Sequence, residues 1–347
     1  MFEDIPEVSE RYEQRLSYHT NELTQIAPLG PWCSISQRNG LNAPLLGSST
    51  HLFLEGQLTR FPDVNQFLGR IHSLLPDDRY LAFHAITSEN KKNILRRRYV
   101  SWGFKIYYLF YFLGRRVLPK LYGVRWVSKK LSIPIDMSKS EIMGRLIYNG
   151  FQIVEIRESS DNTLFIAQPD PAYEPNEARK DSNEGILFTM RRLGKNARPM
   201  TIYKFRSMHP YSEFVQAYLH RSNGLDAEGK FKNDFRVSTG GKFIRKYWID
   251  EIPMIYNLLR GDIKLIGVRP ISEHYFSLYP EEMRSMRSRH KPGLLPPFYA
   301  DLPNSFEEIV ESERRYLEAY EKAPLQTEVS YFFKILRNIF INKARSK

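Results

Sequence analysis

Cysteine is nearly absent from this 347-residue chain, which contains only Cys33. One cysteine cannot form an internal disulfide, and no Cys pair or Cys/His cluster has the spacing of a zinc site. The first residues, MFEDIPEVSERYEQRLS, are acidic and polar where a secretory signal would have a basic start and an apolar run. We therefore expect a reducing, cytoplasmic environment and no export signal.

The sequence also lacks an apolar run long enough to span a bilayer. A mostly apolar stretch at residues 99–113 lies between Arg96–Arg98 and Arg115–Arg116. As a helix it would reach roughly 22 Å at 1.5 Å per residue, which is short of the roughly 30 Å hydrocarbon core. Two interpretations stay open: an interfacial or re-entrant membrane helix over about residues 99–118, or an ordinary buried helix.

Acidic residues are fewer than basic residues in this chain. The formal net charge is +12, and aromatic residues make up 14% of the chain. This balance predicts an anionic partner, which can be nucleic acid, acidic lipid or a phosphorylated substrate. We expect no nucleic acid partner, because the sequence has no zinc-finger spacing, RNP-like strand or recognisable helix-turn-helix.

The C-terminal segment YFFKILRNIFINKARSK places apolar residues at helical spacing, with Lys and Arg on the other faces. This pattern is typical of a basic amphipathic helix that lies on anionic lipid. A terminal helix docked on the protein's own core has the same periodicity and is the alternative.

A segment rich in Pro, Asp and Glu divides the chain. It runs from Ala167 to Gly185 without strand or helix periodicity, so we predict a linker at 169–184 between a module at 1–168 and a domain at 185–347. Within the first module, the patterns predict strands at 51–55 and 79–86, helices at 63–75 and 139–148, and a hairpin of 151–157 with 163–167. This order predicts an α/β layer.

The segments PDVNQFLGRIHSLLPDDRYLAFHAI and SKSEIMGRLIYNGFQIVEI, in this order, resemble the later half of class I methyltransferase domains. No GxGxG-type loop follows a first strand to hold a cofactor, and residues 1–50 look too short to supply the first half of such a fold. The resemblance implies a truncated Rossmann-like module that acts as a scaffold rather than as a working methyltransferase.

The second half opens with GILFTMRRLGKNARPMTIYKFRSM at residues 185–208. We expect two short strands, the first ending at Arg191 and Arg192 and the second carrying Lys204 and Arg206. Guanidinium and ammonium groups at a strand edge are suited to holding phosphate oxygens. Taken alone, the same pattern is also typical of a solvated strand.

A pair of adjacent carboxylates stands in the next block, GGKFIRKYWIDEIPMIYNLLRGD. Its apolar spacing predicts a helix that begins near Asp250, with Pro253 in the first turn. Asp250 and Glu251 would then lie at the positive end of the helix dipole, close to Arg245. We expect both influences to favour ionised carboxylates, able to bind a divalent metal or to attack phosphorus. Ordinary helix capping is the alternative.

The third block, IKLIGVRP, predicts a buried strand that delivers Arg269 to a turn fixed by Gly267 and Pro270. An arginine held in this way can pair with a diphosphate or stack on a base.

The three blocks together resemble the catalytic domain of bacterial sugar transferases, the monotopic polyprenol-phosphate phosphoglycosyl transferases. The family segments YKFRSM, GxFIRK…DExP and GDxxLxGxRP are matched at 203–208, 241–253 and 261–270. The resemblance implies a compact α+β domain in which Asp250 is the nucleophile and Glu251 its acidic partner around Mg²⁺. It further implies substrate-binding roles for Lys204, Arg206, Arg245, Arg269 and Pro270.

The reaction implied by the resemblance has two steps. Asp250 attacks the β-phosphorus of a UDP-sugar and UMP leaves; polyprenyl (undecaprenyl) phosphate then takes the sugar phosphate and starts glycan assembly. This implies a bacterial protein at the cytoplasmic face of the inner membrane, monotopic or peripheral, with anionic lipids as partners and a homo-oligomer as an open option. A catalytically weakened, membrane-associated scaffold of a glycan-assembly complex is the alternative.

The sequence departs from the family in its membrane segment and around its motifs. Family members usually carry a re-entrant helix directly before the first block, where this chain has the acidic linker. Tyr247 and Trp248 replace small polar residues, and Val268 stands where the family tends to have proline. These departures leave the sugar unassigned and keep the scaffold alternative open.

Overall fold

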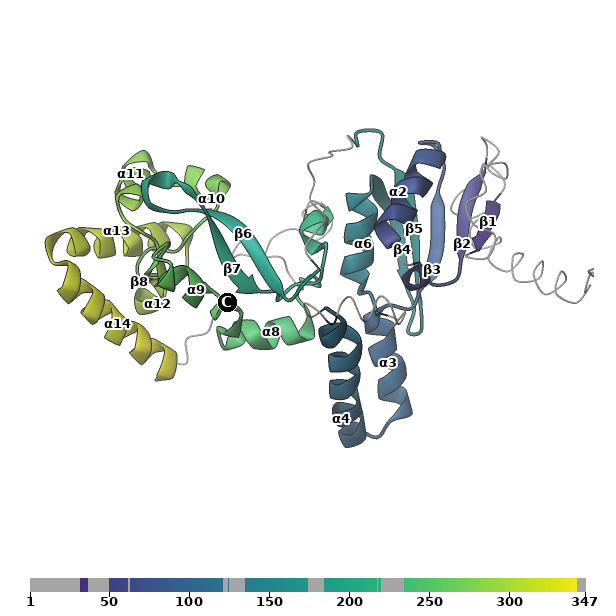
Figure 1. Cartoon of the computed structure of the whole chain (residues 1–347), viewed down its shortest axis with the longest axis horizontal. Helices are drawn as coiled ribbons and strands as arrows, with labels where there is room; N and C mark the ends of the chain where they lie inside the picture. Colours follow the sequence, from purple (N-terminus) through teal and green to yellow (C-terminus); the bar gives the residue numbers. More distant parts are fainter. Residues whose placement is uncertain are drawn as a thin grey trace, which may run out of the picture. The chain divides into compact units, whose positions relative to one another are not determined.

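The computed structural model divides the chain into two compact units (Figure 1). Unit 1 comprises residues 1–182 together with 210–215, and unit 2 comprises residues 183–209 and 216–347. The structure describes residues 32–36, 50–61, 63–120, 124, 135–173, 184–216, 218–219 and 234–341. Most of the N-terminal 50 residues, most of the predicted linker, and Lys343 and Arg345 of the C-terminal segment lie outside the described residues.

Unit 1 is built on a five-stranded sheet with the strand order β1-β2-β3-β5-β4. The first three strands are parallel, and β5 is antiparallel to both of its neighbours. The bounds are β1 Trp32–Ser36, β2 His51–Glu55, β3 Leu81–Ala85, β4 Phe151–Glu158 and β5 Thr163–Pro169. The predicted α/β layer is therefore confirmed.

Two helices of unit 1, α2 and α6, follow the predicted periodicity closely. Helix α2 begins where the Asp63 carboxylate accepts a hydrogen bond from the Gln66 amide, and its apolar stripe is buried. Helix α6 packs against α2 and β4. The helices are α2 Val64–Leu74, α3 Ser88–Arg98, α4 Ser101–Phe112 and α6 Lys139–Tyr148, with short turns η2 Leu58–Arg60, η3 Leu113–Val117, η4 Leu118–Lys120 and η6 Ser212–Val215.

Sequence and structure agree on β2 and α6 to the residue, and they differ at the ends of β3, β4 and β5. The strand predicted at 79–86 is limited to Leu81–Ala85. Strand β5 extends to Pro169, because its pairing with Phe151 on β4 continues into the start of the predicted linker.

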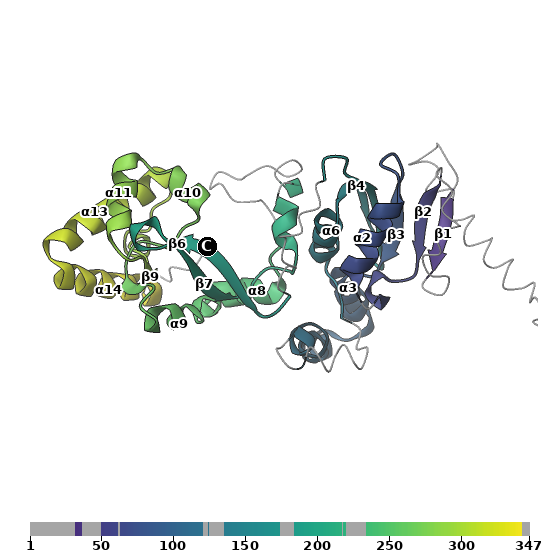
Figure 2. The ribbon, with the colours of Figure 1, turned by 45° about the horizontal axis from the view of Figure 1, so that its top comes forward.

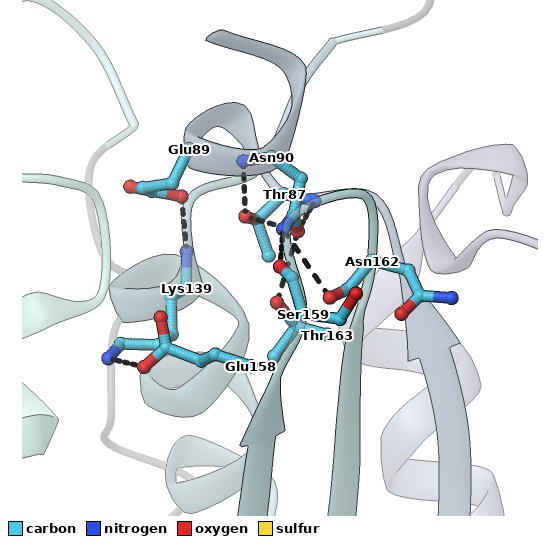
Figure 3. Close-up of polar contacts among 8 residues, drawn as sticks. All are labelled: Thr87, Glu89, Asn90, Lys139, Glu158, Ser159, Asn162 and Thr163. Carbon is cyan, nitrogen blue, oxygen red and sulfur yellow. Dashed lines mark hydrogen bonds and ion pairs between the residues drawn. The ribbon is translucent and has the colours of Figure 1, made fainter. Parts of the chain in front are cut away.

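A polar network fixes the start of α3 to the hairpin of β4 and β5 (Figure 3). Thr87 and Asn90 form a capping box, with the Asn90 amide donating to the Thr87 hydroxyl. The Asn90 side chain also donates to the Ser159 carbonyl at 2.7 Å and accepts from the Thr163 hydroxyl at 3.0 Å. Next to it, the Glu89 carboxylate accepts from the backbone amide of Lys139. Buried polar groups that are all satisfied hold one geometry, so α3 has a defined origin.

Residues 210–215 follow β7 of unit 2 in the sequence but belong to unit 1. Tyr211 is 1% exposed, and the Arg145 guanidinium lies 4.3 Å from its ring centroid. Its hydroxyl accepts a hydrogen bond from the Asn65 side chain. The backbone of this segment crosses α6 at Gly144, where an added Cβ would lie 2.1 Å from the Tyr211 carbonyl oxygen. We call residues 210–215 the docking segment.

The close approach at Gly144 reverses the change in stability that is usual for a glycine-to-alanine substitution in a helix. Alanine normally stabilises a helix interior relative to glycine by roughly 0.5–1 kcal/mol. At Gly144 the new methyl group would meet backbone atoms, so we expect Gly144→Ala to destabilise unit 1 by about 1–3 kcal/mol. Thermal unfolding of the full chain, followed by calorimetry, measures the change.

Gly69 in α2 is the matched control for this prediction. A Cβ there would meet only the Asn149 side chain, at 3.5 Å, which is an ordinary contact. Gly69→Ala should therefore unfold at the wild-type temperature or above it. Equal stability of the two variants would contradict the described crossing of the docking segment over α6.

Unit 2 combines small sheets with a helical layer. Strands β6 Leu187–Leu193 and β7 Pro199–Phe205 form an antiparallel hairpin, and β8 Lys264–Ile266 pairs in parallel with β9 Gly293–Leu295. The helices and turns are η5 Lys195–Ala197, α8 Thr239–Lys246, η7 Ile249–Glu251, α9 Met254–Leu259, α10 Glu273–Ser277, α11 Glu281–Arg289, α12 Phe298–Asp301, α13 Phe306–Lys322 and α14 Pro324–Phe340.

The C-terminal helix α14 has two different faces. Tyr331 and Ile335 pack into the core of unit 2, and the Asn338 side chain donates to the carbonyls of Tyr299 and Ala300. The interpretation as a helix docked on its own core therefore holds for this face. On the outer face, apolar side chains are exposed: Leu325, Val329, Phe333 and Phe340. Among the described residues, no helix is both long and apolar enough to cross a membrane.

Candidate active site

The three sequence blocks of unit 2 meet at one carboxylate oxygen. Lys204, near the end of β7, donates from Nζ to Oε1 of Glu251 in η7 at 2.7 Å. Arg269, which follows β8, places Nη2 3.8 Å from the same oxygen. The side chains of Lys204 and Glu251 are mostly buried, at 14% and 11% exposure, whereas that of Arg269 is 44% exposed. The site thus has an inner ion pair and an outer, accessible cation.

Asp250 lies beside this pair and is 7% exposed. Its Oδ1 is buried and has no hydrogen-bond partner among the described residues. Burial raises the pKa of the Asp250 carboxyl, and the nearby charges of Lys204 and Arg245 oppose the shift. The expectation that the surroundings favour an ionised Asp250 is therefore not met, because desolvation outweighs the cations.

The local backbone also differs from the predicted helix. Asp250 and Glu251 belong to the 3₁₀ turn η7, and Pro253 is the N-cap residue of a separate, six-residue α9. The turn is started by Trp248, which has the left-handed φ of 55° that is uncommon for a residue with a side chain. The Trp248 indole donates to the Tyr299 hydroxyl at 3.0 Å, which holds this conformation. The departure from the family at Trp248 therefore has a structural role.

Arg245 approaches the site from the last turn of α8. Its Nε donates to the Ser207 hydroxyl at 2.7 Å. Burial lowers the pKa of Arg245, while the charges of Asp250 and Asp234 oppose that shift. Helix α8 itself lies close to Ser207, because a Cβ on Gly241 would be 1.7 Å from the Ser207 carbonyl oxygen. Ser207 therefore orients Arg245, a role that its place inside YKFRSM did not reveal.

Asn257 on α9 is a second residue that sequence reasoning missed. It is fully buried, and its side chain accepts from the Tyr203 amide at 3.2 Å and donates to the Thr201 carbonyl at 2.7 Å. It also donates to Asp262 at 3.1 Å. These bonds fix α9 to β7 and so set the distance between Glu251 and Lys204.

The remaining predicted substrate-binding residues are Arg206 and Pro270. Arg206 donates from Nε to the Gly185 carbonyl at 3.0 Å and lies over the Phe188 ring. Pro270 is buried next to Arg269. Burial, together with the charge of Arg269, lowers the pKa of Arg192 on β6. Arg192 is thus a further cation beside the predicted set.

The donor atoms suit a magnesium ion that takes most of its ligands from a substrate. No group of three or more His, Cys, Asp or Glu with metal-site geometry occurs among the described residues. Mg²⁺ is commonly bound by one or two carboxylates plus substrate phosphates. Asp250 offers an unpartnered buried oxygen, and Glu251 adjoins it.

Residues 177–340 match the family described as bacterial sugar transferase. This match covers somewhat less than half of the chain. The family predicted from the three blocks is confirmed for this region. Unit 1 is almost entirely outside the match, so its resemblance to methyltransferases stays a prediction.

Three relatives illustrate the similarity. The galactosyl transferase CpsE of Streptococcus agalactiae is 36% identical over 40% of this chain and 31% of that protein. The UDP-N-acetylgalactosamine-undecaprenyl-phosphate N-acetylgalactosaminephosphotransferase of Aeromonas hydrophila is 37% identical over 31% of this chain and 24% of its own length. The undecaprenyl-phosphate galactose phosphotransferase of Salmonella typhimurium is 33% identical over 35% of this chain and 26% of its own length. The chain thus spans less than a third of each of these relatives.

The raised pKa of Asp250 predicts opposite effects of two neighbouring substitutions. Its charge is stabilised less in the folded protein than in the unfolded chain, so Asp250→Asn should raise the unfolding temperature of unit 2 at neutral pH. The gain should shrink as the pH falls through the raised folded pKa and vanish below 3.8, the ordinary value for aspartate. Calorimetry over a pH series measures both effects.

Glu251→Gln is the matched control for this measurement. Glu251 accepts a charge-assisted hydrogen bond from Lys204, so its neutralisation should destabilise unit 2 by about 1–3 kcal/mol at neutral pH. If Asp250→Asn were destabilising to the same extent, the burial argument for Asp250 would be wrong.

Proposed function

We propose that this protein transfers a sugar 1-phosphate from a UDP-sugar to undecaprenyl phosphate. The observation that carries the proposal is the Asp250 carboxylate, which is buried, keeps an unpartnered oxygen, and stands among the charges of Lys204 and Arg245. The names of the relatives, which mention undecaprenyl phosphate and UDP-activated sugars, support the two substrates.

In the first step, an Asp250 oxygen attacks the β-phosphorus of the UDP-sugar. The new bond joins Asp250 to phosphorus, the bond from that phosphorus to the bridging oxygen breaks, and UMP leaves with the electron pair. In the second step, an oxygen of undecaprenyl phosphate attacks the same phosphorus and releases the carboxylate. A carboxylate nucleophile divides a displacement between two crowded anions into two easier steps.

The cations of the site suit this chemistry. Arg269 is accessible and Lys204 lies behind it, so a diphosphate entering the site would meet two positive charges at different depths. Glu251 holds Lys204 in place, and Ser207 holds Arg245. Preorganised charges of this kind stabilise the transition state of phosphoryl transfer. Asp250 and Glu251 would hold Mg²⁺, which when bound offsets the charge of the diphosphate.

We further propose that the protein is peripheral or monotopic at the cytoplasmic face of the membrane, where undecaprenyl phosphate is accessible. Unit 1 would serve as a truncated Rossmann-like scaffold. Two features support this. Helix α2 connects the parallel strands β2 and β3, and strand β5 lies between β3 and β4 and runs antiparallel to both.

Enzymatic assay of the purified full chain tests the proposal. We expect wild-type protein with radiolabelled UDP-sugars, undecaprenyl phosphate and Mg²⁺ to release UMP and form a lipid-linked product. Asp250→Asn should lower the rate by at least about 10³-fold, because removal of a nucleophile abolishes the covalent route. Intact-mass analysis of wild type with donor alone should show one phosphosugar adduct at Asp250.

Two results would reject this assignment. Full activity of Asp250→Asn would remove Asp250 from the reaction. The absence of product with every common UDP-sugar would favour the scaffold alternative.

A further inference from the structure

Helix α4 of unit 1 presents its most apolar face outward. No residue of Ser101–Phe112 is buried. At 100° per residue, five side chains occupy an arc of about 100° on one side of the helix and its continuation. All five are exposed, with Trp102 at 72% and Phe110 at 68%, and the set is Trp102, Ile106, Leu109, Phe110 and Leu113. We call this set the outer face of α4.

The other side of α4 carries the polar contacts. The Lys92 ammonium of α3 lies 5.7 Å from the Tyr108 ring centroid, and the Tyr111 hydroxyl donates to Asp136. Tyr108 stacks on Phe104 at 5.4 Å. A helix on the surface of a water-soluble domain has the reverse arrangement, with polar residues outward. The apolar outer face therefore indicates a partner.

The position of α4 suits a surface contact. Helices α3 and α4 pack side by side and extend beyond the end of the sheet of unit 1 (Figures 1 and 2). The network around Asn90 anchors α3 at its start (Figure 3). The hairpin of α3 and α4 is thus anchored at the start of α3, and α4 is in a position to present its outer face.

The charge of the sequence that contains α4 indicates the chemistry of the partner. Residues 90–135 contain twelve Lys and Arg residues and no Asp or Glu, so this stretch alone carries a charge equal to the +12 of the whole protein. Exposed members adjoin the outer face in the sequence: Arg96 and Arg98 precede α4, and Lys105 directly precedes Ile106. A second copy of the chain would bring the same positive charge to the contact, which disfavours self-association.

We propose that the outer face of α4 inserts into the headgroup region of an anionic bilayer, with the surrounding cations on lipid phosphates. At about 18 Å for twelve residues the helix is too short to span the hydrocarbon core, so it would lie in the interface. The inference rests on the proposed function only in that undecaprenyl phosphate resides in a membrane. It assigns lipid binding to unit 1 rather than to the sugar transferase domain.

Sedimentation of the full chain with vesicles tests the proposal. We expect binding to phosphatidylcholine vesicles that contain phosphatidylglycerol, and at least about tenfold weaker binding to phosphatidylcholine alone, because cations near an anionic surface strengthen binding. The double variant Ile106→Gln/Phe110→Gln should lose at least about tenfold in vesicle affinity, since two inserted apolar side chains become polar. Both positions are exposed, so the fold should tolerate the changes.

The matched control is Val329→Gln/Phe333→Gln on the outer face of α14, which should bind vesicles as wild type does. Loss of binding in this control with retention in the α4 variant would overturn the proposal and place the lipid contact on α14. Equal affinity for neutral and anionic vesicles would also overturn it. So would a wild-type dimer in solution that the α4 substitutions dissociate, because a second copy would then cover the face.

Asp250→Asn separates this inference from the transferase reaction. It should bind anionic vesicles like the wild type while forming no lipid-linked product. Vesicle binding without catalysis by the wild type would therefore reject the proposed function alone. Catalysis in detergent without vesicle binding would reject the lipid surface alone.

Discussion

The ion pair between Lys204 and Glu251 is the interaction on which the arrangement of unit 2 depends. Each of the two groups would be costly to bury alone, and together they tie the β6–β7 hairpin to the turn that carries Asp250. Asn257 ties the next helix, α9, to the backbone of β7. These contacts hold the turn in place, so that Asp250 stays buried with one carboxylate oxygen that makes no hydrogen bond to the described residues. Such a carboxylate is unfavourable for stability, and it suits a group that must react.

Elements with strong periodicity could be predicted from the sequence, and features that depend on distant contacts could not. The bounds of β2 and α6 follow from local patterns of apolar residues. The turn at Trp248 requires a hydrogen bond to Tyr299, 51 residues away, and no local pattern announces a left-handed tryptophan. The same holds for Ser207, whose role depends on Arg245 in the following helix. The motifs identified the candidate pair Asp250 and Glu251, whereas the residues that position this pair became visible only in three dimensions.

Periodicity also could not decide the environment of the aromatic segment. An apolar helix in a protein core and one that faces outward can have the same composition, so the sequence left both interpretations open for residues 99–118. The structure separates them, because α4 has no buried residue. The charge count around it was available in the sequence all along, but it acquires meaning only beside an exposed apolar surface.

The docking segment limits how this protein can have been assembled from older parts. The chain enters unit 2 at residue 183, returns to unit 1 for residues 210–215, and enters unit 2 again. A gene fusion that simply joined two independent coding sequences end to end would not create such a path unless Tyr211 and the glycine it crosses had adapted to each other afterwards. If either half were exchanged with that of another lineage, the docking segment would meet a helix to which it had not adapted. The two halves are therefore expected to have been inherited together.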